Sequence, residues 1–308
     1  ITSVTDNSNV PTPSDSIPLP INITVNPLPD VTFSTSTPEI CFKDVAELDF
    51  GFLVGSSPFT INYQINFINQ PPLQISGTGN QTYTITPDPQ VGINTYTVTQ
   101  ITDNNGCMYP NPLPSVNIQV NDNPDLDLVI SGANPICFGE SSSLFFPVIL
   151  GKAPFDLDYT INGFASSVQV DAMGNVLATS LPLPINPDST TTYSISYIKD
   201  ANNCENTSIN VNKTLIVHEL PFVDITGTTE ICVEELTKLY FDFTSGLSPW
   251  QVYYNINGFM DVTPLMNSAY DSLYISPTSS IDYVYDSIVD ANGCSQALSE
   301  IVTINVNT

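Results

Sequence analysis

The chain has 308 residues, of which 31 are acidic and only five are basic, so its formal net charge at pH 7 is −26. Nucleic-acid phosphates and anionic lipid headgroups are bound through cationic side chains, so this charge excludes both as partners. No apolar stretch is long enough to insert into a membrane, and 26 prolines without helical periodicity predict that helix is close to absent.

One stretch recurs along the chain and defines a repeat. Thr95–Cys107 reads Thr-Tyr-Thr-Val-Thr-Gln-Ile-Thr-Asp-Asn-Asn-Gly-Cys. Copies with Tyr, Ile and Asp at the same distances from the cysteine end at Cys204 and Cys294. Residues 1–10 fit the last part of the pattern, with Val10 in the place of the cysteine. The chain is therefore expected to begin inside a repeat and to contain three complete ones.

The elements of each repeat follow one order. An Ile-Cys pair is followed by a Pro-aromatic strand, by the Tyr strand with its Asp-to-Cys turn, and by an alternating strand that closes the repeat. The closing strands end at Val25, Val120, Val217 and Val306. This spacing, about 90 to 100 residues, suits one small core and is too long for solenoid or propeller repeats.

Short segments of period two, rich in Val, Ile, Thr, Tyr and Phe, alternate with Pro, Gly, Asn and Asp. This pattern predicts an all-β chain of tandem immunoglobulin-like (PKD-like) antiparallel β-sandwiches. The expected boundaries are 1–26 for the C-terminal part of a preceding module and 27–121, 122–218 and 219–308 for three complete modules.

The second repeat serves as the template for the strands. Seven are expected, near residues 126–131, 142–150, 155–161, 166–171, 176–184, 191–198 and 209–217. Asn162-Gly163 and Asn257-Gly258 predict type I′ hairpin turns, because both residue types reach positive φ at low cost. Phe67 stands where the first repeat should have glycine, so a different turn is expected there. Tyr193 and Ile198 fall on opposite faces of one strand, which predicts a bulge near Tyr197.

The connectors between modules are short and contain proline: Asn26–Pro29, Asp122–Asp125 and His218–Pro221. Such connectors make stiff joints, so the modules are expected to form a rod.

The six cysteines fall two to a repeat. We expect Cys41 to pair with Cys107, Cys137 with Cys204 and Cys232 with Cys294, in each case at one pole of a sandwich. Disulfides indicate an oxidising, extracytoplasmic compartment. The alternative is that all six are buried free thiols.

A search for catalytic residues finds little. His218 is the only histidine and lies at a joint, far in sequence from any nucleophile, so no enzymatic activity is predicted. No local cysteine cluster suits zinc, and no cofactor motif is present. Asp122, Asp125 and Asp127 crowd one joint and are the candidate ligands of a structural calcium ion. The Asp103 turn is explained without calcium, because Asp and Asn side chains bond the backbone two residues on.

Tyrosines recur at two places, and we interpret them as core residues whose hydroxyls reach a loop backbone: Tyr96, Tyr193, Tyr283, Tyr63, Tyr159 and Tyr254. Trp250 replaces a phenylalanine of the other copies and is also expected in the core. A sugar-binding platform would require several exposed aromatics on one face.

The Pro-aromatic strand and the Asp-x-Asn-Gly-Cys ending, clearest at Asp290–Cys294, resemble repeats of the SprB-like giant gliding-motility adhesins of Bacteroidetes. The resemblance covers the whole chain. It implies a cell-surface adhesin that is exported by the type IX secretion system and moved along the cell by the gliding machinery. It also implies O-glycosylation at Asp-Ser-hydrophobic or Asp-Ser-Thr motifs, which here contain Ser16, Ser189, Ser272 and Ser287.

Taken together, the sequence predicts a non-enzymatic stalk segment of a long extracellular adhesin. Its partners would be the neighbouring modules, with an external surface or polysaccharide bound through other parts of the protein. Two alternatives remain open: a carbohydrate-binding module and a self-assembling surface-layer or fibre subunit.

Overall fold

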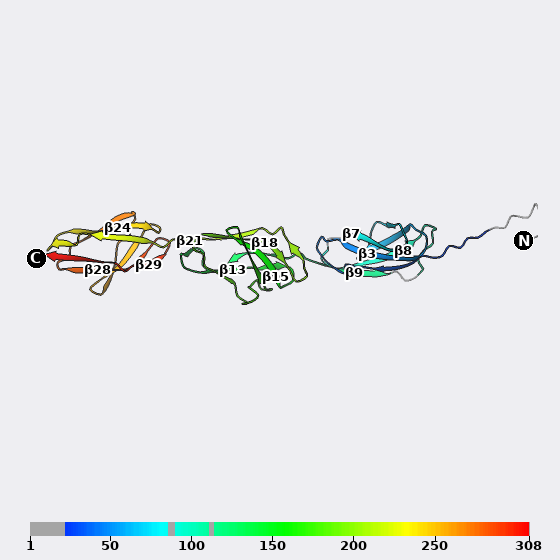
Figure 1. Ribbon diagram of the computed structural model, residues 1–308, viewed down its shortest axis with the longest axis horizontal. Helices are drawn as coiled ribbons and strands as arrows, with labels where there is room; N and C mark the ends of the chain where they lie inside the picture. Colours follow the sequence, from blue (N-terminus) through cyan, green and yellow to red (C-terminus); the bar gives the residue numbers. More distant parts are fainter. Residues whose placement is uncertain (1–21, 86–89, 111–113, 308) are drawn as a thin grey trace, which may run out of the picture. The chain divides into compact units, whose positions relative to one another are not determined.

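The computed structural model of the protein describes residues 22–85, 90–110 and 114–307, in which every regular element is a strand (Figure 1). The all-β prediction is therefore confirmed. The expected half-module lies mostly outside the described residues, as does Ser16. None of the described residues belongs to a helix that could cross a membrane. The chain divides into two compact units, Ile1–Asp122 and Asn123–Thr308.

The first unit contains one sandwich of two sheets. The first sheet has the order β1 (Asp30–Ser34), β3 (Ala46–Val54), β7 (Gly79–Ile85). The second runs β2 (Glu39–Cys41), β9 (Ser115–Asn121), β8 (Gly92–Thr102), β4 (Phe59–Ile65), β5 (Ile68–Asn69), with β6 (Leu73–Ile75) also on β4. Neighbouring strands are antiparallel except β2, which runs parallel to β9.

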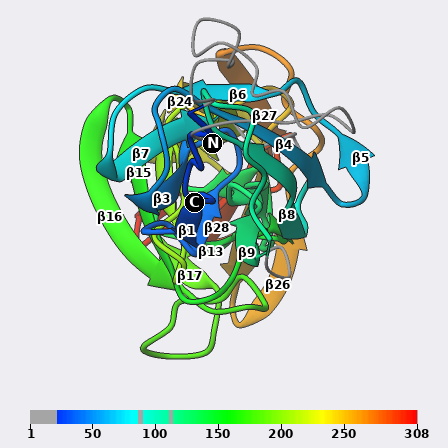
Figure 2. The same cartoon turned by 90° about the vertical axis from the view of Figure 1, so that its right-hand side faces the viewer.

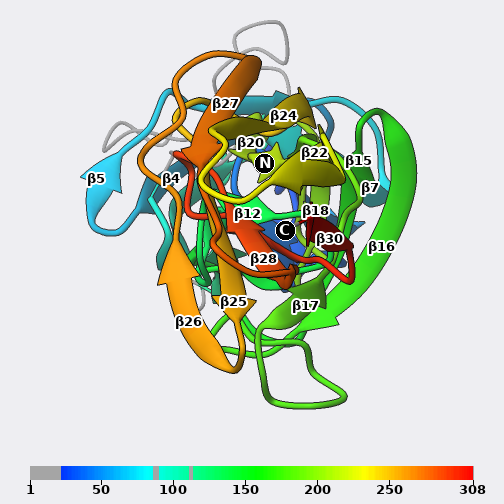
Figure 3. The ribbon, with the colours of Figure 1, turned by 90° about the vertical axis from the view of Figure 1, so that its left-hand side faces the viewer.

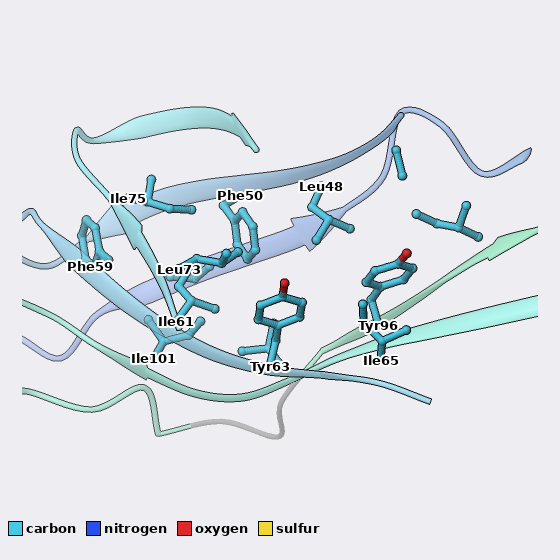
Figure 4. Close-up of a cluster of buried hydrophobic side chains, with 14 of the residues drawn as sticks. Leu48, Phe50, Phe59, Ile61, Tyr63, Ile65, Leu73, Ile75, Tyr96 and Ile101 are labelled. Atoms are coloured by element: carbon cyan, nitrogen blue, oxygen red, sulfur yellow. The ribbon is translucent and has the colours of Figure 1, made fainter. Parts of the chain in front are cut away.

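The core of this sandwich follows directly from the alternation of residues along its strands. Every second residue of β4, from Phe59 to Ile65, is buried. Phe50 and Leu48 of β3 approach the same space from the facing sheet (Figure 4). Phe52 and Phe59 stack with their ring centroids 4.0 Å apart. Burial of these apolar side chains is the main stabilising contribution to the sandwich.

The second sandwich, in the second unit, repeats the arrangement, with shorter strands in the first of its two sheets. One side consists of β11 (Val129–Ile130), β13 (Ser142–Phe145) and β17 (Leu183–Ile185), and beside them β10 (Asp125–Leu126) pairs with β14 (Val148–Leu150). The facing sheet has the order β16 (Phe164–Val170), β15 (Phe155–Ile161), β18 (Thr191–Lys199), β19 (Glu205–Asn206), with β20 (Val211–Leu215) also on β18. β12 (Ile136–Cys137) runs parallel to β21 (Val217–His218).

The third sandwich, also in the second unit, has its own core. One sheet has the order β22 (Phe222–Gly227), β24 (Thr237–Ser245), β27 (Tyr270–Ile275). The other runs β23 (Glu230–Cys232), β30 (Ile301–Asn307), β28 (Ile281–Val289), β25 (Gln251–Ile256), β26 (Phe259–Val262), with β29 (Ser295–Ala297) on β28.

All three sandwiches share one strand order, in which a short strand crosses to the second sheet and runs parallel to the closing strand. This is the arrangement of immunoglobulin-like sandwiches, and it confirms the predicted fold class. The hairpin strands β5, β16 and β26 form the edges of their sheets (Figures 2 and 3).

The hairpin turns confirm one prediction and correct another. Asn162-Gly163 and Asn257-Gly258 have positive φ at both residues, as a type I′ turn requires. Phe67, however, also has a positive φ of 69°, so the first repeat makes the same turn without glycine. The side chain of Asn66 fixes this turn, because its Oδ1 accepts a bond from the Thr95 N–H at 2.9 Å and its Nδ2 donates to Asn94.

The bulge expected near Tyr197 is present. Asp158 lies opposite Tyr197 and Tyr159 lies opposite Ile195, so Ser196 is the extra residue. The corresponding strands of the other repeats carry the same bulge, at Thr99 and Asp286.

Two details of the strand prediction are wrong. Residues 176–182, expected as the start of a strand, form turns with isolated bridges, and only Leu183–Ile185 pairs with β13. The sequence analysis also missed β12 and β19, each of which has only two residues. A strand this short leaves no periodic pattern in the sequence.

Candidate functional site

Each sandwich has two poles, and its two cysteines lie at opposite ones. We call the end where the chain enters the sandwich the N pole and the end where it leaves the C pole. In the third sandwich, Cys232 lies beside Asn307, the last residue of the closing strand, and hence at the C pole. Cys294 follows β28, whose first residues pair with the closing strand, so it lies at the N pole.

The C-pole cysteine begins a turn that is built alike in all three repeats. The side-chain carboxylate of the residue three positions after the cysteine accepts a hydrogen bond from the cysteine N–H. The N···O distances are 3.2 Å for Cys41 and Asp44, 2.8 Å for Cys137 and Glu140, and 2.9 Å for Cys232 and Glu235. The residue before each carboxylate has positive φ: Lys43, Gly139 and Glu234. The sequence analysis missed this turn, although the Ile-Cys-x-x-acid spacing was visible in every copy.

The N-pole cysteine ends a turn organised by a buried aspartate. In the third repeat, Oδ1 of Asp290 accepts the N–H groups of Asn292 and Cys294, and Oδ2 accepts the N–H of Leu247, each at 2.9 Å. Asp103 and Asp200 do the same in the other repeats, with distances of 2.9 to 3.1 Å. The predicted bond to the backbone two residues on is therefore confirmed, and this carboxylate also ties two loops together.

A glycine beside this turn holds the connector that leads into the sandwich. A Cβ on Gly246 would lie 2.8 Å from Cα of Pro221 and 3.0 Å from Nε1 of Trp250, so only glycine allows this approach. Trp250 in turn stacks on Phe243 at 4.6 Å. Gly55 with Pro29, and Gly151 with Pro124, repeat the contact in the other sandwiches.

A disulfide joins the second sandwich to the third. Cys137, at the C pole of the second, is bonded to Cys294, at the N pole of the third, and their Cα atoms are 5.6 Å apart. The same two sandwiches are also joined by the connector His218–Pro221. Leu220 of this connector accepts a bond from Ser245 Oγ at 2.7 Å. Two covalent links thus cross one joint.

This bond corrects the predicted pairing of cysteines within repeats. Cys137 does not bond Cys204, and Cys294 does not bond Cys232. Cys107 and Cys232 carry free thiols, so Cys107 does not pair with Cys41 either. Cys41 and Cys204 are both disulfide-bonded.

The physical reason for the correction is the direction of the strands. Cys232 and Cys294 lie at opposite ends of β28, which has nine residues. At about 3.3 Å per residue the strand spans roughly 30 Å. The Cα atoms of a disulfide are about 4 to 7 Å apart, so pairing within a repeat would require the sandwich to unfold.

The remaining candidate residues are not brought together. Among the described residues, no group of three or more His, Cys, Asp or Glu side chains is placed to hold a metal ion. Oδ1 of Asp127, a predicted calcium ligand, accepts the N–H of Leu128 at 2.7 Å. His218 lies in β21 opposite Cys137. Of the serines in glycosylation motifs, Ser189 is exposed in a loop, whereas Ser272 and Ser287 are half-buried in β27 and β28.

The repeated tyrosines all lie in the cores, as predicted. The Tyr254 hydroxyl, however, donates to Oδ2 of Asp261 at 3.3 Å and not to a loop backbone. Burial, reinforced by Asp261, raises the pKa of Tyr254 to about 12. Burial also raises the pKa of Tyr283 and, more strongly, that of Tyr285.

An aromatic surface that the sequence analysis did not identify lies on the outer face of the third sandwich. Tyr270 and Tyr274 of β27 are exposed, and Tyr240 of β24 stacks against Tyr270 at 5.7 Å. Lys238 Nζ lies 4.4 Å from the centre of the Tyr274 ring. The alternation of residues along the strands could have identified this surface from the sequence, because its residues occupy the positions between the core residues of β24 and β27.

No known protein-family profile matches the chain, and no curated protein matches it. Among solved structures, the chain is similar to part of a 1.5-MDa bacterial ice-binding adhesin, with 13% identity, a TM-score of 0.39, and coverage of 92% of this chain and 99% of that one. It is similar to a marsupial T cell receptor, with 9% identity, a TM-score of 0.40, and coverage of 88% and 99%. It is also similar to fibronectin(III)-like modules of Clostridium thermocellum CbhA, with 13% identity, a TM-score of 0.27, and coverage of 62% and 95%.

Proposed function

We propose that the chain is a non-enzymatic spacer segment of a long extracellular adhesin and that it carries tensile force. The observation that carries the proposal is the Cys137–Cys294 disulfide, which adds a second covalent link to a joint that already has a short proline-containing connector. Two links across one joint restrict the rotation of one sandwich relative to the other.

The disulfide also limits how far the chain lengthens if the sandwiches unfold under tension. Force entering the second sandwich passes from Cys137 directly to Cys294. The 157-residue separation of these cysteines is then excluded from the stretched path. A fully extended chain spans about 3.3 to 3.6 Å per residue, so the bond removes roughly 500 Å of extension.

The proposed location follows from the same bond, because structural disulfides persist in oxidising compartments outside the cytoplasm. The net charge of −26 suits a long molecule that must stay soluble beside its own copies.

The similarity of the repeat to gliding-motility adhesins extends the proposal. On this basis the whole protein would be a type IX secretion substrate carried along the cell surface by the gliding machinery, with its adhesive ligand bound elsewhere. Ser189 is the glycosylation candidate that the fold favours, because it is exposed. Protein isolated from its native source should then exceed the polypeptide mass by a glycan that maps to Ser189. A bare mass would remove this part of the proposal.

Single-molecule stretching tests the tensile role. The full chain is held by handles attached at residue 123 and at the C-terminus, so that only the second and third sandwiches lie between them. The Cys107→Ser/Cys232→Ser chain keeps the joint disulfide and should show a short extension. The Cys137→Ser/Cys294→Ser chain should extend further by roughly 500 Å, the length of the released segment. Equal extensions of the two chains would contradict the proposal.

The aromatic surface of the third sandwich favours a second candidate, carbohydrate binding. Tyr240, Tyr270 and Tyr274 provide ring faces, and the exposed Asp242 lies opposite Tyr270 in the register. Exposed aromatic patches are a common feature of interaction sites. A glycan array separates the candidates: a spacer binds no glycan, whereas a binding module binds one and loses it in the Tyr270→Ala/Tyr274→Ala chain.

A further inference from the structure

The C-pole turn of the third sandwich is built like the bonded turn of the second. Cys232 N–H donates to Oε2 of Glu235 at 2.9 Å, as Cys137 N–H donates to Glu140 at 2.8 Å. The following residue also donates to the closing strand in both, from Val233 to the Asn307 carbonyl at 3.1 Å and from Phe138 to the His218 carbonyl at 2.8 Å.

The two turns differ in the state of the sulfur. Cys137 is bonded to the N-pole cysteine of the sandwich that follows it, whereas Cys232 is exposed and carries a free thiol. Its own sandwich offers no partner, because Cys294 lies at the opposite pole and is already bonded to Cys137.

The N-pole turn also exists with a free thiol. Cys107 ends a turn in which Asp103 accepts the N–H groups of Asn105, Cys107 and Ser56, the arrangement that Asp290 gives Cys294. The chain therefore contains one free cysteine in a C-pole turn, Cys232, and one free cysteine in an N-pole turn, Cys107.

We propose that Cys232 is the receiving half of a further joint, and that it forms a disulfide with the N-pole cysteine of another copy of this repeat placed next in the same chain. The joint between the second and third sandwiches supplies the pattern, in which the C-pole cysteine of one repeat bonds the N-pole cysteine of the next. The partner repeat is identified by its N-pole turn. This turn has the sequence Asp-x-Asn-x-Cys and presents the cysteine sulfur beside a proline-containing connector. This inference does not depend on the tensile role proposed above.

The bond forms by thiol–disulfide exchange. The Cys232 thiolate attacks an oxidant disulfide, such as oxidised glutathione or the disulfide of an oxidoreductase, and releases one thiol of the oxidant. The thiolate of the incoming cysteine then displaces the second. Two protein thiols are oxidised, one oxidant disulfide is reduced to two thiols, and the two protons end on those thiols.

The test extends the full chain at its C-terminus with a second copy of residues 219–308, in which the copy of Cys232 is replaced by serine, and refolds it with oxidised and reduced glutathione. Only the original Cys232 can then be labelled in a C-pole turn of the third repeat type. In the original chain, a maleimide should label Cys232 of the folded protein. In the extended chain this labelling should be lost, and non-reducing peptide mapping should show Cys232 bonded to the appended copy of Cys294. Replacing that appended cysteine by serine should restore the labelling.

Two results would overturn the proposal. One is an extended chain in which Cys232 is still labelled although the fluorescence of both tryptophans shows that the appended copy has folded. The other comes from the Cys137→Ser variant of the original chain, which needs no appended copy to fold. This variant should leave both Cys232 and Cys294 free, and a bond between them would show that a repeat pairs its own cysteines.

Discussion

The backbone N–H of Cys294 donates to Oδ1 of Asp290 at 2.9 Å, so a buried carboxylate positions the sulfur that crosses to the preceding sandwich. The same carboxylate binds Asn292 and Leu247. The cysteine turn, the neighbouring loop at Leu247 and the joint therefore all depend on one side chain.

Replacing Asp290 should destabilise the third sandwich. Alanine leaves three N–H groups without an acceptor, and a buried unsatisfied donor costs about 1 to 3 kcal/mol. We expect Asp290→Ala to lower the free energy of unfolding by about 3 kcal/mol. Asn should lower it by about half as much, since its amide group can replace only one of the two oxygens as an acceptor. Urea unfolding followed by the fluorescence of Trp250, the only tryptophan, measures the change.

Asp242 provides the control, because its side chain is exposed on the outer face of the same sandwich. Asp242→Ala should leave the urea midpoint nearly unchanged. A similar loss in both variants would show that the effect is general charge removal and not loss of the turn.

Phe67→Gly should stabilise the first sandwich. Phe67 is 91% exposed and has a φ of 69°, a conformation that glycine adopts without steric cost. The expected gain is about 0.5 to 1 kcal/mol. Phe164→Gly is the matched control, because Phe164 is exposed in the equivalent hairpin but lies within β16, where glycine weakens a strand. Hydrogen exchange of β4 and β15, followed by mass spectrometry, should slow in the first variant and not in the second.

The hairpins also show how far the sequence could predict the fold. Period-two alternation located long strands such as β15 and β18, and Asn-Gly located two turns, because these signals arise from neighbouring residues. At Phe67 the local signal failed, since contacts of Asn66 with Asn94 and Thr95 fix the turn. The strand β12 owes its existence to pairing with β21, 81 residues later in the chain, which no local pattern reveals.

The cysteine pairing failed for a related reason. Similar cysteine spacing within each repeat suggested pairing within the repeat, but spacing along the chain does not say at which pole a residue lies. The direction of β28 decides that Cys232 and Cys294 are at opposite ends. The Asp-to-Cys turn, by contrast, was interpreted correctly from sequence, because Asp290 bonds residues only two and four positions away.

Gly246 and Gly258 allow packing to be separated from backbone strain. Both have a φ of +84°, so a Cβ introduces the same conformational cost at each. A Cβ on Gly258 meets nothing within 4 Å, whereas a Cβ on Gly246 meets Pro221 at 2.8 Å. We expect Gly258→Ala to cost about 1 kcal/mol and Gly246→Ala at least about 2 kcal/mol, the excess being the overpacking of the connector. Equal losses of urea stability would mean that the connector moves aside freely.

Alkaline pH should destabilise the third sandwich through Tyr254. Burial and the adjacent Asp261 raise the pKa of its hydroxyl from 10.0 to about 12. Between pH 10 and 12 the unfolded chain loses this proton more readily than the folded chain does, so the stabilising effect is complete below pH 10 and is lost as the pH rises to 12. Urea unfolding by circular dichroism at several pH values, in a Cys107→Ser/Cys232→Ser background that prevents thiol exchange, should show the decline. Tyr254→Phe should make the decline shallower while Tyr285 and Tyr283 maintain part of it. Tyr270→Phe, at an exposed position, should keep the original slope. If Tyr254→Phe keeps that slope as well, the Tyr254 hydroxyl does not titrate in this window and the explanation is wrong.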